Sequence, residues 1–179
     1  MENNMENNTE NIMENETVRL VDVDTDNFYD LIKLSPGEEG KEYVASNVFS
    51  LAEAYANVAE GRYAKPFGIY LGDTPIGFLM IGYGIVDDDD DQEEQYFLND
   101  SYLFWRFMVD EKYQNKGYGR QAMQLALDFI RTFPSGPAKY CWLSYEPENK
   151  KAKKLYESFG FVEEKLPEGW DEIPSVLEL

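Results

Sequence analysis

The sequence of 179 residues contains no histidine and a single cysteine, Cys141. Histidine is the usual general base near neutral pH and the commonest metal ligand, so its absence argues against hydrolytic triads and zinc sites. One cysteine excludes an internal disulfide. Because Cys141 falls in a predicted core strand, we interpret it as a small buried thiol, and we expect a reducing compartment. From the absence of histidine we expect no metal cofactor.

Long apolar runs are also missing from the sequence. None approaches the roughly 18 residues that span a bilayer, and the N-terminus carries acidic residues where a signal peptide carries basic ones. We therefore expect a cytoplasmic protein with no membrane partner.

Basic residues are scarce, with 16 Lys and Arg against 35 Asp and Glu and a net charge of −19 at pH 7. A surface with this field repels phosphate backbones, which argues against a nucleic-acid partner. It attracts cations, so a small cationic amine substrate would be steered toward the protein. Solubility alone explains the same charge. We read the acidic run at 87–94 as a solvated loop, with an entry region for a cationic substrate as the alternative.

The most informative stretch of the sequence is 102–120. Residues 102–109 are apolar or aromatic except Arg106, as in a strand that is covered on both faces. Residues 114–120 follow, and their two glycines open a helix whose first N–H groups have no partner in the chain. Their lysine and arginine add positive charge, so an anion fits there. The pattern is neither GxxxxGK[ST] nor GxGxxG.

Two blocks of this sequence resemble the GNAT superfamily of acetyl-CoA-dependent N-acetyltransferases. Residues 114–119 read Gln-x-x-Gly-x-Gly, like the family's pyrophosphate loop, and 149–161 resemble its Asn-x-x-Ala-x-x-Leu-Tyr-x-x-x-Gly-Phe segment. Their separation fits one helix and one strand. Trp-Arg-Phe-Met-Val-Asp-Glu-Lys-Tyr-Gln and Ser-Tyr-Glu-Pro-Glu-Asn look most like bacterial diamine and spermidine N-acetyltransferases, and the resemblance is clear over 66–162.

The fold that this resemblance implies is α/β (α+β): a mixed, mostly antiparallel sheet with flanking helices and a central parallel pair of strands that splay apart. Residues 102–109 and 139–145 match those two strands. The alternation of strand and helix independently argues for a mixed sheet. We expect a disordered tail at 1–16, whose Met-Glu-Asn repeats bury little surface, and a single N-acetyltransferase domain at 17–179.

Hydrophobic periodicity and turn residues predict the remaining elements. Either Ser46 or Asn47 is expected to cap the second helix. The predicted elements are a strand from 17, a short helix capped near Asp24 and running through 32, a helix over 48–58, a hairpin of 67–71 and 74–85, a helix over 119–133, a helix that follows Asn149 and stops at Gly160, and strands at 161–162 and 175–179.

The resemblance places acetyl-CoA, used as a co-substrate, between the splayed strands. Backbone groups of Phe107, Met108 and Val109 would bind its pantetheine arm, and Asn149 and Lys153 are further expected contacts. The loop expected to bind the pyrophosphate consists of Gln114, Asn115, Lys116, Gly117, Tyr118, Gly119 and Arg120. Residues 107–109 are equally explained as a core strand, and Lys153 as a solvated helix lysine.

Tyr156 matches the family's tyrosine that protonates the departing thiolate. A tyrosine pKa near 10 keeps the proton in place at pH 7, whereas a thiol like that of cysteine has a pKa of about 8.5. The transfer is therefore uphill by roughly 2 kcal/mol, which positioning and a lowered tyrosine pKa would offset. The alternative is that Tyr156 is one member of an apolar helix stripe.

The acceptor amine must lose a proton before it attacks, which costs about 4–5 kcal/mol at pH 7 for a pKa near 10.4. Without histidine, the base is a carboxylate or bulk solvent, and Glu146 and Glu53 are the candidates. Trp105 and Tyr70 could form an apolar wall for a methylene chain, with core packing as the alternative. Arg106 requires a carboxylate partner or a position at the sheet edge, and the sequence does not identify either.

Together these features predict an enzyme, an N-acetyltransferase that moves the acetyl group of acetyl-CoA to a polyamine or diamine of the spermidine or spermine type. Transfer would be direct, in a ternary complex. The alternatives are acetylation of another amine, such as an aminoglycoside, an amino acid or a protein N-terminus, and a non-catalytic acyl-CoA-binding module. The resemblance also implies a homodimer.

Overall fold

The computed structural model describes residues 17–86 and 95–179. The tail predicted at 1–16 and the acidic loop at 87–94 lie outside the described residues. No helix within the described part of the chain is both long and apolar enough to span a bilayer.

A seven-stranded sheet organises these residues, in the order β1-β2-β3-β4-β5-β7-β6. Its strands are β1 (Val18–Asp22), β2 (Tyr63–Leu71), β3 (Thr74–Tyr83), β4 (Ser101–Val109), β5 (Tyr140–Tyr145), β6 (Val162–Glu163) and β7 (Ile173–Glu178). The helices are α1 (Phe28–Leu31), α2 (Asn47–Ala59), α3 (Tyr118–Ile130) and α4 (Lys150–Glu157), with 3₁₀ turns at Gly40–Glu42, Tyr96–Leu98 and Glu111–Tyr113. The predicted mixed, mostly antiparallel fold class is confirmed.

Polar side chains begin two of the helices as the sequence predicted. Ser46 accepts the N–H of Phe49 at the start of α2, and Asn149 accepts the N–H of Ala152 at the start of α4. The cap expected near Asp24 is wrong, because Asp24 instead accepts the N–H groups of Asp26 and Asn27 in the preceding turn. Helix α1 therefore begins late, at Phe28.

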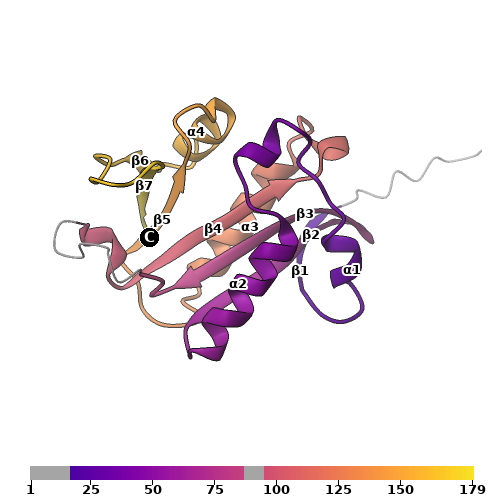
Figure 1. Cartoon of the computed structure of the whole chain (residues 1–179), viewed down its shortest axis with the longest axis horizontal. Helices are drawn as coiled ribbons and strands as arrows, with labels where there is room; N and C mark the ends of the chain where they lie inside the picture. The colour runs from indigo at the N-terminus through magenta and orange to yellow at the C-terminus, as the bar shows by residue number, and fades with distance from the viewer. Residues whose placement is uncertain (1–16, 87–94) are drawn as a thin grey trace, which may run out of the picture.

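The central strands separate soon after they meet. Strands β4 and β5 are parallel and pair at only three positions, Ser101 with Tyr140, Tyr102 with Cys141 and Leu103 with Trp142. Beyond Leu103, β4 continues to pair with β3 on its other side. Strand β5 pairs with β7 along its whole length, on the side away from β4. Figure 1 shows β4 and β5 diverging toward α3 and α4, which leaves a gap at the centre of the sheet.

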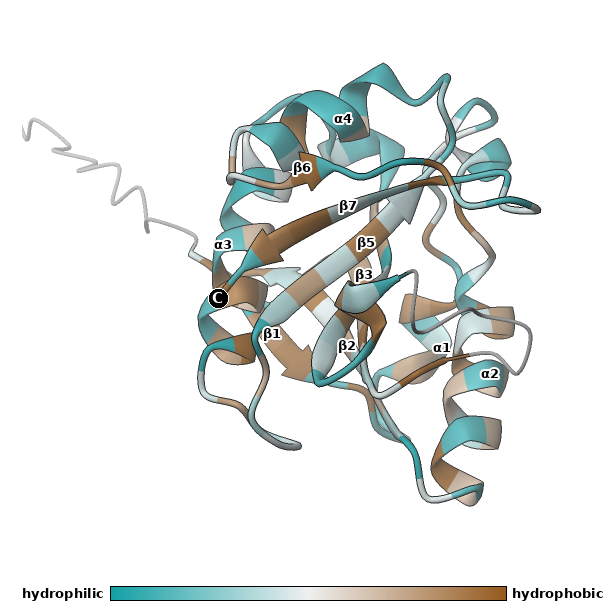
Figure 2. Cartoon of the chain, turned by 90° about the vertical axis from the view of Figure 1, so that its left-hand side faces the viewer, coloured by the Kyte–Doolittle hydropathy of each residue, from teal (hydrophilic) through white to brown (hydrophobic). Residues whose placement is uncertain are grey.

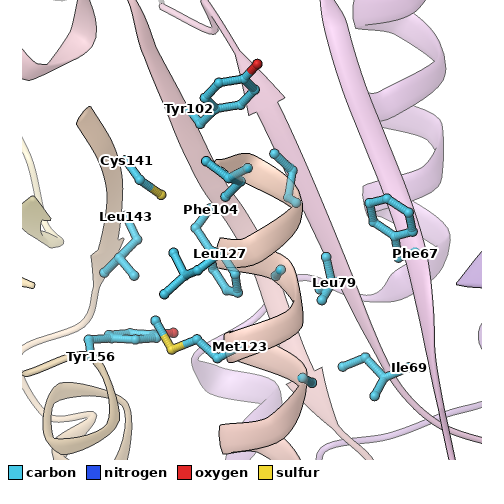
Figure 3. Packing of buried hydrophobic residues seen from close by; sticks show 14 of the residues in the cluster. Phe67, Ile69, Leu79, Tyr102, Phe104, Met123, Leu127, Cys141, Leu143 and Tyr156 are labelled. Carbon is cyan, nitrogen blue, oxygen red and sulfur yellow. The ribbon is translucent and has the colours of Figure 1, made fainter. Parts of the chain in front are cut away.

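Helices α2 and α3 cover opposite faces of the sheet (Figure 1). Helix α3 packs on one face of the sheet, where Met123 and Leu127 belong to one apolar cluster with Phe104 of β4 and Leu143 of β5 (Figure 3). Each large side chain buried in this way contributes about 1.5–3 kcal/mol. This packing fixes the start of α3 close to the point where β4 ends.

Helix α4 is the most polar of the helices, and Figure 2 shows its ribbon as mainly hydrophilic. Its inward side nevertheless carries Tyr156, which is only 8% exposed and belongs to the same apolar cluster as α3. The positive φ of Gly160, 93°, ends this segment as predicted. The helix is thus anchored by one aromatic side chain over the gap between β4 and β5.

The close approach of β3 and β4 provides a test of this core. A methyl group at Gly77 would lie 2.5 Å from the carbonyl oxygen of Met108, so we expect Gly77→Ala to force the two strands apart. The expected loss is about 1–3 kcal/mol of unfolding free energy, measured by urea denaturation. Gly119→Ala is the control, because its methyl group would meet nothing closer than 3.6 Å. Equal stability of the two variants would contradict the strand packing described above.

Candidate active site

A cleft of about 810 Å³ opens where β4 and β5 part. One wall is the 104–109 part of β4, and the opposite wall is formed by the end of β5 and by α4. The start of α3 closes one end, and the segment 39–45, which includes the 3₁₀ turn Gly40–Glu42, borders another side. The cleft therefore collects residues from elements that are far apart in the sequence.

The β4 wall offers backbone groups for binding. Residues 104–109 pair with β3 but not with β5, so their groups on the β5 side have no strand partner among the described residues. A β-bulge at Trp105 shifts the register between Phe104 and Arg106 at this point. An extended ligand can bind such an edge as an added strand does. Phe107, Met108 and Val109 all line the cleft.

The loop that precedes α3 is held in a strained shape. Asn115 and Gly117 have φ angles of 62° and 83°, both left-handed. The side chain of Gln114 donates to the carbonyl oxygens of Pro36 and Val109, both at 2.9 Å, which ties the loop to the end of β4. The first-turn N–H groups of α3 have no acceptor within their own helix, as in any helix. Gly117 at the N-cap has no side chain that could accept from them. This is the geometry of an anion site.

The predicted loop residues do not all face the cleft. Gln114, Asn115 and Gly119 line it, whereas Lys116, Gly117, Tyr118 and Arg120 are not among the lining residues. The ammonium of Lys116 donates to the carbonyl oxygen of Lys112 at 2.9 Å. The guanidinium of Arg120 donates to the hydroxyl of Ser158 at 2.6 Å. Both cations therefore lie near the helix N-terminus but are held by the protein.

The hydroxyl of Tyr156 is free to act as a donor in the cleft. The side chain lines the cleft and forms no hydrogen bond with the described residues. Figure 3 shows its ring reaching from α4 toward Met123 of α3, with the hydroxyl at the far end. Burial raises the pKa of Tyr156, and the charge of Glu172 and the neighbouring Tyr145 raise this pKa further. The phenol therefore stays protonated near neutral pH.

The cofactor contacts predicted on α4 differ in their surroundings. Asn149 lines the cleft while it caps the helix. Lys153 does not line it, because its ammonium lies 2.7 Å from the carboxylate of Glu163 and 3.7 Å from that of Glu157. Glu163 also accepts the hydroxyl of Tyr145 at 2.6 Å. Burial, followed by this hydrogen bond, raises the pKa of Tyr145 to about 12.

The partner of Arg106, which the sequence left open, is Glu53. The guanidinium and the carboxylate are 2.8 Å apart, and their side chains are 20% and 24% exposed. Since β4 carries Arg106 and α2 carries Glu53, this pair joins the helix to the bulged strand. Trp105 lines the cleft, and the Arg106 guanidinium lies 5.3 Å from its ring centre.

The other predicted acceptor-side residues lie apart from the cleft. Neither Glu53, Glu146 nor Tyr70 is among its lining residues. Tyr70 is buried in β2 beneath the guanidinium of Arg19. Glu146 follows β5, and its carbonyl oxygen accepts the N–H of Asn149. Core packing explains the position of Tyr70, and the backbone contact with Asn149 explains that of Glu146.

Four carboxylates that the sequence reasoning missed do line the cleft: Glu39, Glu42, Glu148 and Glu172. They come from the segment after α1, from the start of α4 and from the residue before β7. The only available signal was the overall negative charge, because their approach depends on which strands are neighbours. Within the described part of the chain, no group of three or more His, Cys, Asp or Glu side chains is arranged to hold a metal ion.

Comparison with known proteins agrees with this geometry. The family model described as the acetyltransferase (GNAT) family matches residues 25–161. A spermine/spermidine N(1)-acetyltransferase of Bacillus subtilis is 28% identical over 145 residues, which cover 81% of this chain and 88% of the relative.

Two solved structures share the fold. A Vibrio cholerae spermidine N-acetyltransferase in complex with CoA and spermine has a TM-score of 0.65 at 19% identity, covering 92% of this chain and 96% of that one. An aminoglycoside acetyltransferase in complex with coenzyme A has a TM-score of 0.71 at 16% identity, with 90% and 95% covered.

The ion pair between α2 and β4 can be separated from a role in proton removal. We expect Glu53→Gln to lower the unfolding free energy by about 1–3 kcal/mol, because it leaves the partly buried Arg106 with a neutral partner. Urea denaturation measures this loss. The control is Glu60→Gln in the exposed pair with Arg62, for which about 0–1 kcal/mol is expected.

If Glu53 were the base, the outcome would be different. Its replacement would then also lower the turnover of the folded protein, by about 10²–10⁴-fold. Unchanged stability would instead contradict the structural role of the ion pair.

Proposed function

The chain belongs to the GNAT acetyltransferase family, and on this premise we propose that it transfers the acetyl group of acetyl-CoA directly to a primary amine of a polyamine. The observation that carries the proposal is the cleft between β4 and β5, which Tyr156 and the anion-binding loop border together. The enzyme is an N-acetyltransferase; its acceptor is the part that we propose.

The residues that line the cleft fit acetyl-CoA. The edge of Phe107, Met108 and Val109 that faces away from β3 has no strand partner among the described residues and would bind the pantetheine arm as an added strand. The first N–H groups of α3 would bind the pyrophosphate, with Asn149 as a contact on the opposite wall. Acetyl-CoA supplies the activated acyl group, and the protein supplies its position and the exclusion of water.

Tyr156 donates the proton that the departing sulfur requires. The lowered pKa expected from the sequence is wrong, because burial raises the pKa of Tyr156. The position of the Tyr156 hydroxyl must therefore contribute more to proton transfer than its acidity does. A buried phenol with no other acceptor among the described residues can give its hydrogen bond to the sulfur as negative charge develops there.

The charge of the cleft supports a polycationic acceptor. Four cations line it. Lys41 and Arg106 are paired with Glu38 and Glu53, whereas Lys150 and Lys151 form no ion pair with the described residues and lie beside Asn149, on the wall proposed for acetyl-CoA. The four cleft carboxylates named above also form no ion pair with the described residues. An acceptor with several ammonium groups satisfies them.

Three known acetyltransferases bear on the choice of acceptor. The Bacillus relative is named for spermine and spermidine, and the Vibrio structure contains spermine. An aminoglycoside is the second candidate, because it is also a polycation and is the named substrate class of the other structural neighbour. A homodimer and a cytoplasmic location belong to the same proposal and rest on the family resemblance and on the single cysteine.

A substitution at Gly119 separates the anion site from the fold. Gly119 lies in the first turn of α3 and lines the cleft, and its added methyl group would make only ordinary contacts with Val109 and Phe107. We expect Gly119→Ala to keep or raise stability by about 0.5–1 kcal/mol while it weakens the binding of coenzyme A by about 10-fold. Thermal unfolding and calorimetric titration measure the two effects. An unchanged affinity of Gly119→Ala for coenzyme A would contradict the binding of the pyrophosphate at this turn.

Removal of the phenol hydroxyl tests the proton donor. We expect Tyr156→Phe to lower kcat by about 10²–10⁴-fold with coenzyme A affinity retained. The assay is free-thiol release from acetyl-CoA with spermidine, spermine, putrescine and an aminoglycoside. Tyr83→Phe is the control, since its hydroxyl contacts Pro137 away from the cleft. Full activity of Tyr156→Phe would show that this tyrosine is not the proton donor. Thiol release by the wild type with the aminoglycoside alone would show that the acceptor is an aminoglycoside and not a polyamine.

A further inference from the structure

One cleft carboxylate is held in place by the protein. Glu172 immediately precedes β7, which pairs with β5 so that Ser144 lies opposite Pro174 and Tyr145 opposite Ile173. Through this pairing Glu172 reaches the end of β5, where its carboxylate accepts the hydroxyl of Ser144. The side chain is partly buried and lines the cleft. It is therefore a fixed negative charge on the β5 wall.

This charge lies close to the proton donor. Both Glu172 and Tyr156 line the cleft. Tyr145 pairs with Ile173, the residue after Glu172, and its ring centre lies 5.6 Å from that of Tyr156. In agreement with this geometry, the charge of Glu172 adds to the effect of burial in raising the pKa of Tyr156. The carboxylate and the phenol therefore share one region of the cleft, where the acyl group would lie according to the proposed function. A proton acceptor and a proton donor thus approach the same position from β7 and from α4.

The other carboxylates fit this role less well. Glu53 is occupied by Arg106, and Glu146 does not line the cleft. Glu148 is exposed next to Asn149, on the side proposed for acetyl-CoA, and Glu39 and Glu42 are exposed on the segment that borders the cleft. Glu172 alone among the named candidates combines cleft access, partial burial and a hydrogen bond that fixes it.

We propose that Glu172 binds the reacting ammonium group of the acceptor and takes its proton, with Ser144 as the positioning residue. The inference rests on the proposed function and deepens it. An alkyl ammonium with a pKa near 10.4 is deprotonated only about once in 10³ at pH 7, so a carboxylate held at the reacting nitrogen supplies what bulk water does not.

The proton balance of the step closes with these residues. Glu172 accepts one proton from the ammonium and passes it to solvent. The nitrogen lone pair then forms the C–N bond to the acetyl carbon while the C–S bond breaks. Tyr156 gives its proton to the sulfur and regains one from the nitrogen, which becomes the amide. One proton is released for each acetyl group transferred.

The experiment compares Glu172→Gln with Asp171→Asn in the full chain. Each substitution removes one negative charge, but Asp171 is exposed and does not line the cleft. The amide oxygen of Gln can still accept the Ser144 hydroxyl, so the fold should persist, which thermal unfolding checks. Spermidine binding is measured by calorimetry with coenzyme A present, and kcat/KM by thiol release.

We expect Glu172→Gln to weaken spermidine binding by about 10- to 100-fold and to lower kcat/KM further, by about 10²–10⁴-fold. Asp171→Asn should stay within about twofold of the wild type in both measurements. Coenzyme A affinity should be the same in all three proteins. Ser144→Ala should lower kcat more than it lowers spermidine affinity, because the charge remains but its position is lost.

Equal effects of Glu172→Gln and Asp171→Asn would overturn the inference, because the net charge alone would then act. Wild-type spermidine affinity in Glu172→Gln would overturn it as well, even if turnover fell. If Glu172→Gln does not fold, Glu172→Asp replaces it, with affinity kept within a few-fold and kcat lowered as the supporting result. A wild-type enzyme that releases no thiol with any amine refutes the proposed function itself, which separates the two failures.

Discussion

The separation of β4 from β5 after three paired residues is the constraint on which the rest of the structure depends. A parallel pair that stayed together would satisfy its own backbone groups and leave no space at the centre of the sheet. Because β5 is paired with β7 along its whole length and β4 stays with β3, each strand keeps one neighbour where the two part, with a free edge between them. That edge is polar and extended, as the proposed binding of acetyl-CoA requires. The cleft is thus a property of the pairing and not of any one side chain.

The surrounding elements hold this opening in a fixed shape. Helix α3 fixes the glycine-containing turn at its start through its buried face, and the side chain of Gln114 ties the same turn to the end of β4. On the other face, the pair of Arg106 and Glu53 joins α2 to the bulged strand. The carboxylate of Glu163 accepts from both the Tyr145 hydroxyl of β5 and the Lys153 ammonium of α4, and so links these two elements. A site held by such contacts loses little further order when it binds its ligands.

Prediction from the sequence succeeded where the signal was local. The caps at Ser46 and Asn149, the stop at Gly160 and the strand and turn around 102–120 follow from neighbouring residues, and the structure contains them. Asp24 shows the limit of such signals, because a short polar side chain serves equally well in a turn. The site was harder to predict. Arg106 clearly required a partner, but that partner lies on a helix 53 positions earlier in the chain.

The sequence by itself determined the family, the mixed fold, the glycine-opened turn and the tyrosine that follows it, because each depends on residues a few positions apart. Only the tertiary structure decided which carboxylates face the cleft. Glu172 reaches it because β7 inserts between β5 and β6, and Glu53 pairs with Arg106 because the fold brings α2 near β4. Strand order and helix crossing arise from the packing of the whole core, and no local pattern of residues contains them.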